Sequence, residues 1–147
     1  MARTIVAVIA GYITMFVLVS ATIMCTFLLM GAEWAFKPNS FDASNGWIVM
    51  SLVANLVIGI IGGIVCAIIA KGRKAPAILA LVVFALGLLF AIPALVANRA
   101  NTNVVRTGNV TLTEAMQNAR EPVWVPFTFP IIGAVGVLIG EKLKNRG

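Results

Sequence analysis

Few side chains in this sequence could carry catalysis or hold a cofactor. The chain has no histidine, which removes the most common general base and the ligand of many metal and haem sites. Cys25 and Cys66 do not form a Cys-x-x-Cys pair, and the sequence contains neither a glycine-rich phosphate loop nor a serine nucleophile motif. We therefore predict no catalytic residue, no metal ligand and no bound cofactor, and we expect that the protein is not an enzyme.

Asn55 is the one strongly polar side chain inside a long apolar run. The apolar runs contain no Asp, Glu, Lys or Arg, whereas ionisable groups at membrane depth mark proton relays and coupled transporters. An amide in such a run commonly forms a hydrogen bond to a neighbouring helix. We interpret Asn55 as a helix-packing residue, and the alternative is that it binds an ion or a substrate.

Asn55 belongs to a stripe of small or amide side chains that recur at every fourth position, which places them on one helix face: Ser51, Asn55, Gly59, Gly63 and Ala67. A later run has a second slim face: Gly133, Gly136 and Gly140. Helices in a bilayer associate through close backbone approach, which glycine permits. We predict that these two helices cross tightly, and that leucine at Gly59 or Gly63 is more damaging than leucine at Gly87. The alternative is a face reserved for a partner.

The composition places these residues in a membrane. Of the 147 residues, 61% are hydrophobic and 11% are charged, and the mean hydropathy is +1.02, well above the usual balance of a soluble domain. Four apolar runs have about the length of 20 residues that a spanning helix needs, and they cover residues 4–30, 47–70, 76–97 and 123–140. We predict an all-α polytopic membrane protein, a single domain over residues 1–147 that forms an antiparallel bundle of four transmembrane helices.

Two features are expected between and within the last two runs. Thr111 and Glu114 form a capping-box pattern, which predicts a short amphipathic helix near Leu112 to Ala119 in the second outer loop. The fourth run begins with three prolines at positions 122, 126 and 130. Because proline lacks a backbone N–H, we expect the first third of this run to be irregular.

Charge and aromatic residues indicate the orientation. The positive-inside rule places the face richer in Lys and Arg in the cytoplasm. That face would carry both termini and Arg3, Lys71, Arg73, Lys74, Lys142, Lys144 and Arg146, against Lys37, Arg99, Arg106 and Arg120 outside. Trp34, Trp47 and Trp124 all fall at the predicted outer ends of spans, where an aromatic belt anchors membrane proteins.

The pattern of hydropathy is similar to that of many small four-span proteins of bacterial inner membranes, and that resemblance implies no activity. We expect a multi-pass protein of the cell inner membrane with cytoplasmic N- and C-termini. The leading hypothesis is a non-catalytic accessory or structural subunit that packs against a larger complex, for example a respiratory or photosynthetic one. Its partners would be membrane lipids and other integral membrane subunits, with no nucleic acid. The alternative is a homo-oligomeric channel or transporter, in which the glycine stripe and the proline-rich fourth span line a path between protomers.

Overall fold

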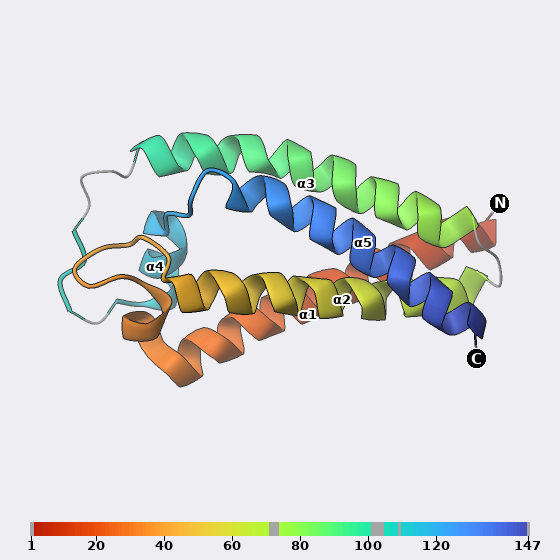
Figure 1. The fold of residues 1–147 in the computed structure, drawn as a ribbon, viewed down its shortest axis with the longest axis horizontal. Helices are drawn as coiled ribbons and strands as arrows, with labels where there is room; N and C mark the ends of the chain where they lie inside the picture. Colours follow the sequence, from red (N-terminus) through yellow and green to blue (C-terminus); the bar gives the residue numbers. More distant parts are fainter. Residues whose placement is uncertain (1, 71–73, 101–104, 109, 147) are drawn as a thin grey trace.

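The computed structural model describes residues 2–70, 74–100, 105–108 and 110–146. Within these ranges the protein is all-helical (Figure 1), with five helices in the order α1 (Ala2–Ala35), α2 (Asn45–Ala70), α3 (Lys74–Ala100), α4 (Leu112–Asn118) and α5 (Val125–Arg146). The four long helices are long and apolar enough to cross a membrane. The chain therefore has the architecture of a multi-pass membrane protein.

The long helices extend past the ends of the apolar runs, because a helix continues through polar flanking residues that lower the hydropathy. The clearest case is α5, which continues beyond the predicted end at residue 140 as far as Arg146. At the end of α1, Gly31 has a φ of 74° and a ψ of 176°, a backbone conformation that suits glycine. The chain is kinked there, and the short helical segment after Gly31 turns away from the axis of the span.

The start of α5 differs from the expectation. The helix begins at Val125 and includes the prolines at 126 and 130, so the prediction of an irregular first third is wrong from Val125 onward. Only residues 122–124 lie outside the helix. Pro126 lies in the first turn, where a backbone N–H would have no helical partner in any case. Pro130 lies inside the helix, and the carbonyl oxygen of the preceding Phe129 accepts a hydrogen bond of 2.8 Å from the Asn55 amide.

The helices are arranged around α2 and α5. The helix α2 packs between α1 and α5, and α3 packs mainly against α5. Figure 1 shows both termini at one end of the molecule, with α4 and the loops beside it at the other end. We call these the terminal end and the α4 end. Toward the α4 end, α1 diverges from α3 (Figure 1).

Two apolar clusters hold the ends of the molecule. The cluster nearer the terminal end includes the fully buried Cys66, Leu79 and Val137. The cluster at the α4 end joins the last part of α1, the loop after it and α4, through Phe27, Ala35, Phe36, Phe41 and Ala115. The end of α1, the loop after it and α4 thus form a small hydrophobic core of their own, which closes the α4 end of the bundle.

Candidate functional site

Backbone-to-backbone contact joins α2 to α5 along what we call the glycine seam, formed by Gly59, Gly63, Gly133, Gly136 and Gly140. A Cβ atom added to Gly59 would lie 2.7 Å from the carbonyl oxygen of Gly133, and one added to Gly136 would lie 2.7 Å from the carbonyl oxygen of Leu56. Gly63 faces the backbone of Val137 and Gly140 faces that of Ile60. The structure thus brings together the glycines of the two slim faces named from the sequence.

Two further glycine contacts were not anticipated. Gly62, next to the stripe, faces α1, where Gly11 lies so close that an added Cβ would be 3.0 Å from the Gly62 carbonyl oxygen. Gly87 on α3 faces the ring of Pro130, and it is therefore an internal contact of the bundle. Adjacent residues on a helix point about 100° apart, so the Gly62–Gly63 pair is a sequence signal for two separate contact faces. The four-residue period of the stripe includes only Gly63.

The other members of the stripe lie in different surroundings. Ala67 is buried near the terminal end. Ser51 and Asn55, toward the α4 end, line a cavity of about 350 Å³ between α1, α2 and the start of α5, together with Trp47, Phe129 and Glu121. One face of α2 therefore begins against a cavity and ends in tight packing.

A second cavity of about 370 Å³ lies among α1, α3 and α5. It shares four lining residues with the first cavity: Val19, Asn55, Glu121 and Phe129. Its remaining walls are mostly apolar and include Tyr12, Phe16, Phe90 and Pro130. A third, smaller cavity of about 220 Å³ lies beneath α4, and Glu121 lines it as well. Among the residues that the structure describes, Glu121 is the one side chain common to these three cavities, and the sequence predictions did not include it.

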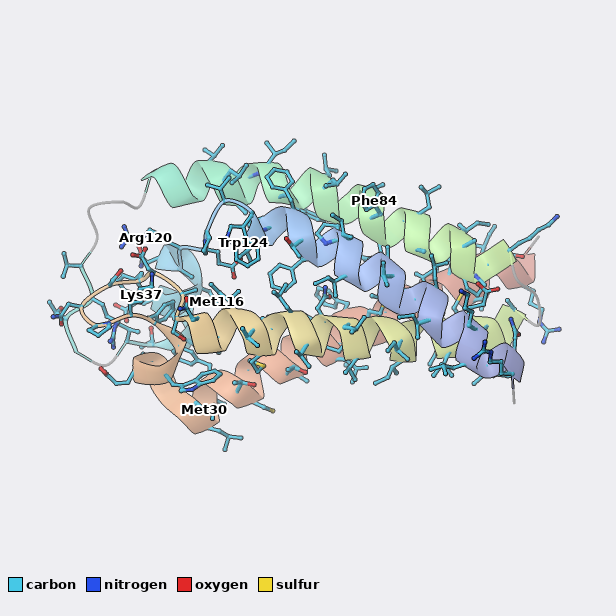
Figure 2. The ribbon with its side chains drawn as sticks, in the orientation of Figure 1. Met30, Lys37, Phe84, Met116, Arg120 and Trp124 are labelled. Carbon is cyan, nitrogen blue, oxygen red and sulfur yellow. The ribbon has the colours of Figure 1, made fainter. Side chains whose placement is uncertain are left out.

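The backbone next to Glu121 is held by the loop between α1 and α2. The N–H of Arg120 donates to the carbonyl oxygen of Phe41 at 2.9 Å, and the N–H of Ala43 donates to the carbonyl oxygen of Arg120 at 2.8 Å. The Arg120 guanidinium also lies 3.0 Å from the carboxylate of Asp42. Figure 2 shows Arg120 at the α4 end. Glu121 is therefore presented to the cavities from a fixed segment, immediately before Pro122.

Burial raises the pKa of the Glu121 carboxyl above its ordinary value, because a low-dielectric environment disfavours the charged form. Glu114 on α4 shows the opposite effect, since hydrogen bonds from the Thr111 backbone and side chain lower the pKa of its carboxyl. These two bonds, with the return bond from the Glu114 N–H to the Thr111 hydroxyl, form a capping box at the start of α4. Glu114 and Glu121 are thus a solvated and a desolvated acid at the same end of the bundle.

Arg106 is a buried cation in the second loop. Its side chain is 3% exposed and lies 3.0 Å from the carboxylate of Glu33, which is 77% exposed. The same guanidinium also donates to the carbonyl oxygen of Gly108 at 3.3 Å. This ion pair connects the second loop to the end of α1. It adds to the bonds through which Arg120 connects the second loop to the first.

The three tryptophans lie in different surroundings. The rings of Trp34 and Trp47 form an edge-to-face pair with centroids 6.0 Å apart. Ser44 links the backbones of the two residues, because its hydroxyl donates to the Trp34 carbonyl oxygen and accepts from the backbone N–H of Trp47. Trp124 precedes α5 and is 53% exposed. Trp47 is thus an interior wall residue of the cavities, whereas Trp124 faces the surroundings.

Within the described residues, no group of three or more His, Cys, Asp or Glu side chains is placed to hold a metal ion. No protein-family model, curated protein or solved structure matches the chain. The function must therefore be inferred from the exposed faces and the cavities.

Proposed function

We propose that this protein is a non-catalytic integral membrane protein that packs as an accessory subunit against a larger assembly of the cell inner membrane. One observation carries this proposal: a patch of small residues on α1, formed by Ser20, Ala21 and Cys25, is exposed on the surface of the bundle.

The small residues of α1 divide between two faces. Gly11 is buried against α2, whereas Ser20, Ala21 and Cys25 are exposed. Ala21 and Cys25 are four positions apart, the spacing that lets a second helix approach closely in a bilayer. Large apolar side chains such as Phe16 and Leu28 flank the patch and are also exposed. This combination favours contact with a transmembrane helix of another polypeptide.

The proposed topology is an antiparallel four-helix bundle with both termini in the cytoplasm. In this arrangement α4 lies on the outer membrane surface, with Ala115 buried against the loops and Met116 exposed. Trp124 serves as an anchor at the membrane–water boundary. The basic residues at the terminal end then face the cytoplasmic leaflet, so the net charge of +6 requires no nucleic-acid partner.

The native thiol of Cys25 offers a direct test, because Cys66 is buried. A maleimide–benzophenone cross-linker attached to Cys25 in membranes should capture another integral membrane polypeptide upon illumination. Cys25→Ser should abolish the adduct, and Ala21→Trp should lower its yield by blocking close approach. Ala85→Trp is the matched control, since Ala85 is also an exposed alanine on a spanning helix, and it should leave the yield unchanged.

Adducts formed only between copies of this chain, together with a pure homo-oligomer upon native separation, would contradict the accessory role and favour the channel or transporter. For the channel or transporter, the glycine stripe of α2 was suggested as part of the lining of a path between protomers. The seam glycines of α2 face α5 of the same chain, so a path between protomers would have to use other helix faces.

A further inference from the structure

We propose that the first cavity, between α1, α2 and the start of α5, binds an uncharged amphiphile whose head group is a hydroxyl. The ligand lies within the bundle, so its binding does not depend on the accessory role. Three side chains that line this cavity carry the inference: Thr22 from α1, and Ser51 and Asn55 from α2. Each has a polar atom to which the described part of the chain makes no hydrogen bond.

The hydroxyl of Thr22 differs from two other hydroxyls on the spanning helices. Thr14 and Thr128 each donate to the backbone carbonyl oxygen four residues earlier, at 2.8 Å, which is a common arrangement on a helix. Thr22 lies on the same helix as Thr14, but among the described residues its hydroxyl has no such bond and it lines the cavity. Because a polar group in apolar surroundings is costly without a partner, this hydroxyl is available to a ligand.

The wall formed by α2 adds a second hydroxyl and an amide oxygen, one helical turn apart. The Asn55 amide nitrogen donates to the carbonyl oxygen of Phe129, which fixes the orientation of the amide and leaves its Oδ1 atom as an acceptor. Within the described ranges, neither this oxygen nor the Ser51 hydroxyl has a hydrogen-bond partner. Neither oxygen is fully enclosed without a partner, so both are accessible.

These groups match a hydroxyl on the ligand. The hydroxyls of Thr22 and Ser51 can donate and accept, whereas the Asn55 oxygen only accepts. A ligand hydroxyl also donates and accepts, so it can bond to all three kinds of partner. An ether lacks the donor that the Asn55 oxygen requires, and an alkyl chain without a head group would leave every one of these groups unpaired.

The head group is uncharged because the three side chains that face it are neutral. A charged group brought into an apolar cavity needs an opposite charge to offset its lost hydration, and hydroxyls and amides supply none. Glu121 also lines the cavity, but it already has an interaction within the protein. The hydroxyl ligand makes no use of that carboxyl group.

The apolar part of the ligand has room in the two larger cavities. Their volumes of about 350 and 370 Å³ lie within the range of about 300–1,000 Å³ that is usual for small-molecule pockets. The described walls are mainly aliphatic and aromatic, with Ile58 in the first cavity and Leu86 in the second. Both cavities are lined by Asn55 and Phe129, so a chain attached to a head group at Asn55 can extend into either.

Photolabelling with a long-chain alcohol tests the proposal. The full chain in nanodiscs is illuminated with a hexadecanol that carries a diazirine within the chain and a terminal alkyne, and the labelled peptides are identified by mass spectrometry. The methyl ether and the carboxylic acid with the same chain are the matched probes. We expect saturable labelling of the cavity walls by the alcohol at concentrations about fivefold or more below those needed with the other two probes, because each lost hydrogen bond weakens binding.

Variants of the wall residues localise the effect. Thr22→Val and Ser51→Ala each remove one hydroxyl with little change in size, and each should weaken labelling by the alcohol about fivefold. Thr14→Val is the matched control, since the Thr14 hydroxyl is already bonded to the carbonyl oxygen of Ala10, and labelling should not change. Ser51→Leu fills the cavity and should abolish the labelling, while thermal unfolding shows that the bundle is folded.

Competition identifies the source of the hydroxyl. Displacement of the probe by unlabelled dioleoylglycerol would support a membrane glyceride as the ligand, and displacement by oleyl alcohol alone would support a free long-chain alcohol. Equal labelling by the alcohol and the ether, displacement by neither competitor, or unchanged labelling in folded Thr22→Val and Ser51→Leu variants would overturn the proposal. Cross-linking at Cys25 is a separate measurement, so the hydroxyl site and the accessory role can fail independently.

Discussion

The two ends of α2 contrast in how they are packed, although one stripe of small residues runs along the helix. Toward the terminal end, Gly63 lies against the backbone of α5. Toward the α4 end, Ser51 faces a cavity of about 350 Å³. The difference shows that a four-residue period identifies which face of a helix is slim, but that neighbouring helices decide whether the space is filled. A larger side chain should therefore be costly at one end of α2 and harmless at the other.

The largest effect is expected for Gly63→Leu. A side chain at this position meets the backbone of Val137, which cannot move aside without shifting α5, and overpacking of a tight core costs about 1–3 kcal/mol or more. Thermal unfolding in detergent should show a loss of stability larger than that of any substitution at the α4 end of α2. Ala85→Leu on the exposed face of α3 is the control. An equal loss of stability in both variants would mean that the glycine seam does not explain the effect of Gly63→Leu.

A smaller but clear loss is expected for Gly87→Leu, about 1 kcal/mol. The sequence suggested that this position is more tolerant than Gly59 or Gly63, and the structure gives it a neighbour, since an added Cβ would lie 2.5 Å from Cγ of Pro130. Gly87 also lines the second cavity, which can take up part of the new side chain. A stability equal to that of the wild type, measured by the same unfolding assay, would mean that α3 is free to move away from α5.

Asn55→Leu should cost less, about 0.6 kcal/mol, the average measured for hydrogen bonds between membrane helices. The change removes the bond from the Asn55 amide to the Phe129 carbonyl, but it leaves an apolar side chain of similar size beside the cavities. Unfolding of the Asn55→Leu variant measures the bond, and Asn55→Gln is the comparison that keeps the amide. A loss of stability as large as that of Gly63→Leu would mean that α2 is packed tightly at Asn55 as well.

The stability should also depend on pH through Glu121. Its pKa is raised in the folded state above the ordinary value of 4.5 by burial, so the folded protein binds this proton more tightly than the unfolded chain does. The resulting stabilisation is fully present below about pH 4.5 and is lost as the pH rises through the folded pKa. The melting temperature of the wild type relative to that of Glu121→Gln should therefore fall between pH 4 and pH 8. A difference that does not vary with pH would mean that Glu121 is solvated.

The smallest effect is expected for Ser51→Leu, the counterpart of Gly63→Leu on the same stripe. Ser51 lines the first cavity, which has room for the new side chain, so the stability should remain within about 0.5 kcal/mol of the wild type or rise slightly, because filling a cavity adds contacts. Parallel unfolding of the two variants tests the contrast between the ends of α2 directly. A strong destabilisation by Ser51→Leu would show that the two ends are packed alike.

Much of the helical framework follows from the sequence, because long apolar runs have only one way to satisfy their backbone in a bilayer. Hydropathy located all four long helices, with ends that differ by a few residues. The spacing of Gly59 and Gly63 indicated a slim face, and the structure places α5 upon it. The sequence did not predict that α5 continues through Pro130. The expectation of irregular backbone came from the behaviour of proline in isolated helices, which takes no account of the neighbouring helices that pack against it.

The candidate site could not be derived in the same way. Glu121 stands in the sequence as a charged residue of a loop, and its place beside the cavities depends on bonds between segments about 80 residues apart, such as that between Arg120 and Phe41. The divergence of α1 is equally non-local, since no single residue specifies it. The nearest signal in the sequence was an acid placed directly before a proline and an apolar span.

The position of α2 between α1 and α5 also bears on the order in which the protein is made. Its contact through Gly62 joins it to the helix synthesised just before it, whereas its contact through Gly63 waits for the last of the four long helices. During biosynthesis, the nascent chain therefore holds a paired α1–α2 hairpin whose glycine seam is open while α3 and the second loop are being translated. Arg120 is also translated after that interval, so the loop-to-loop bonds that it makes with Phe41 and Ala43 can form only late in synthesis.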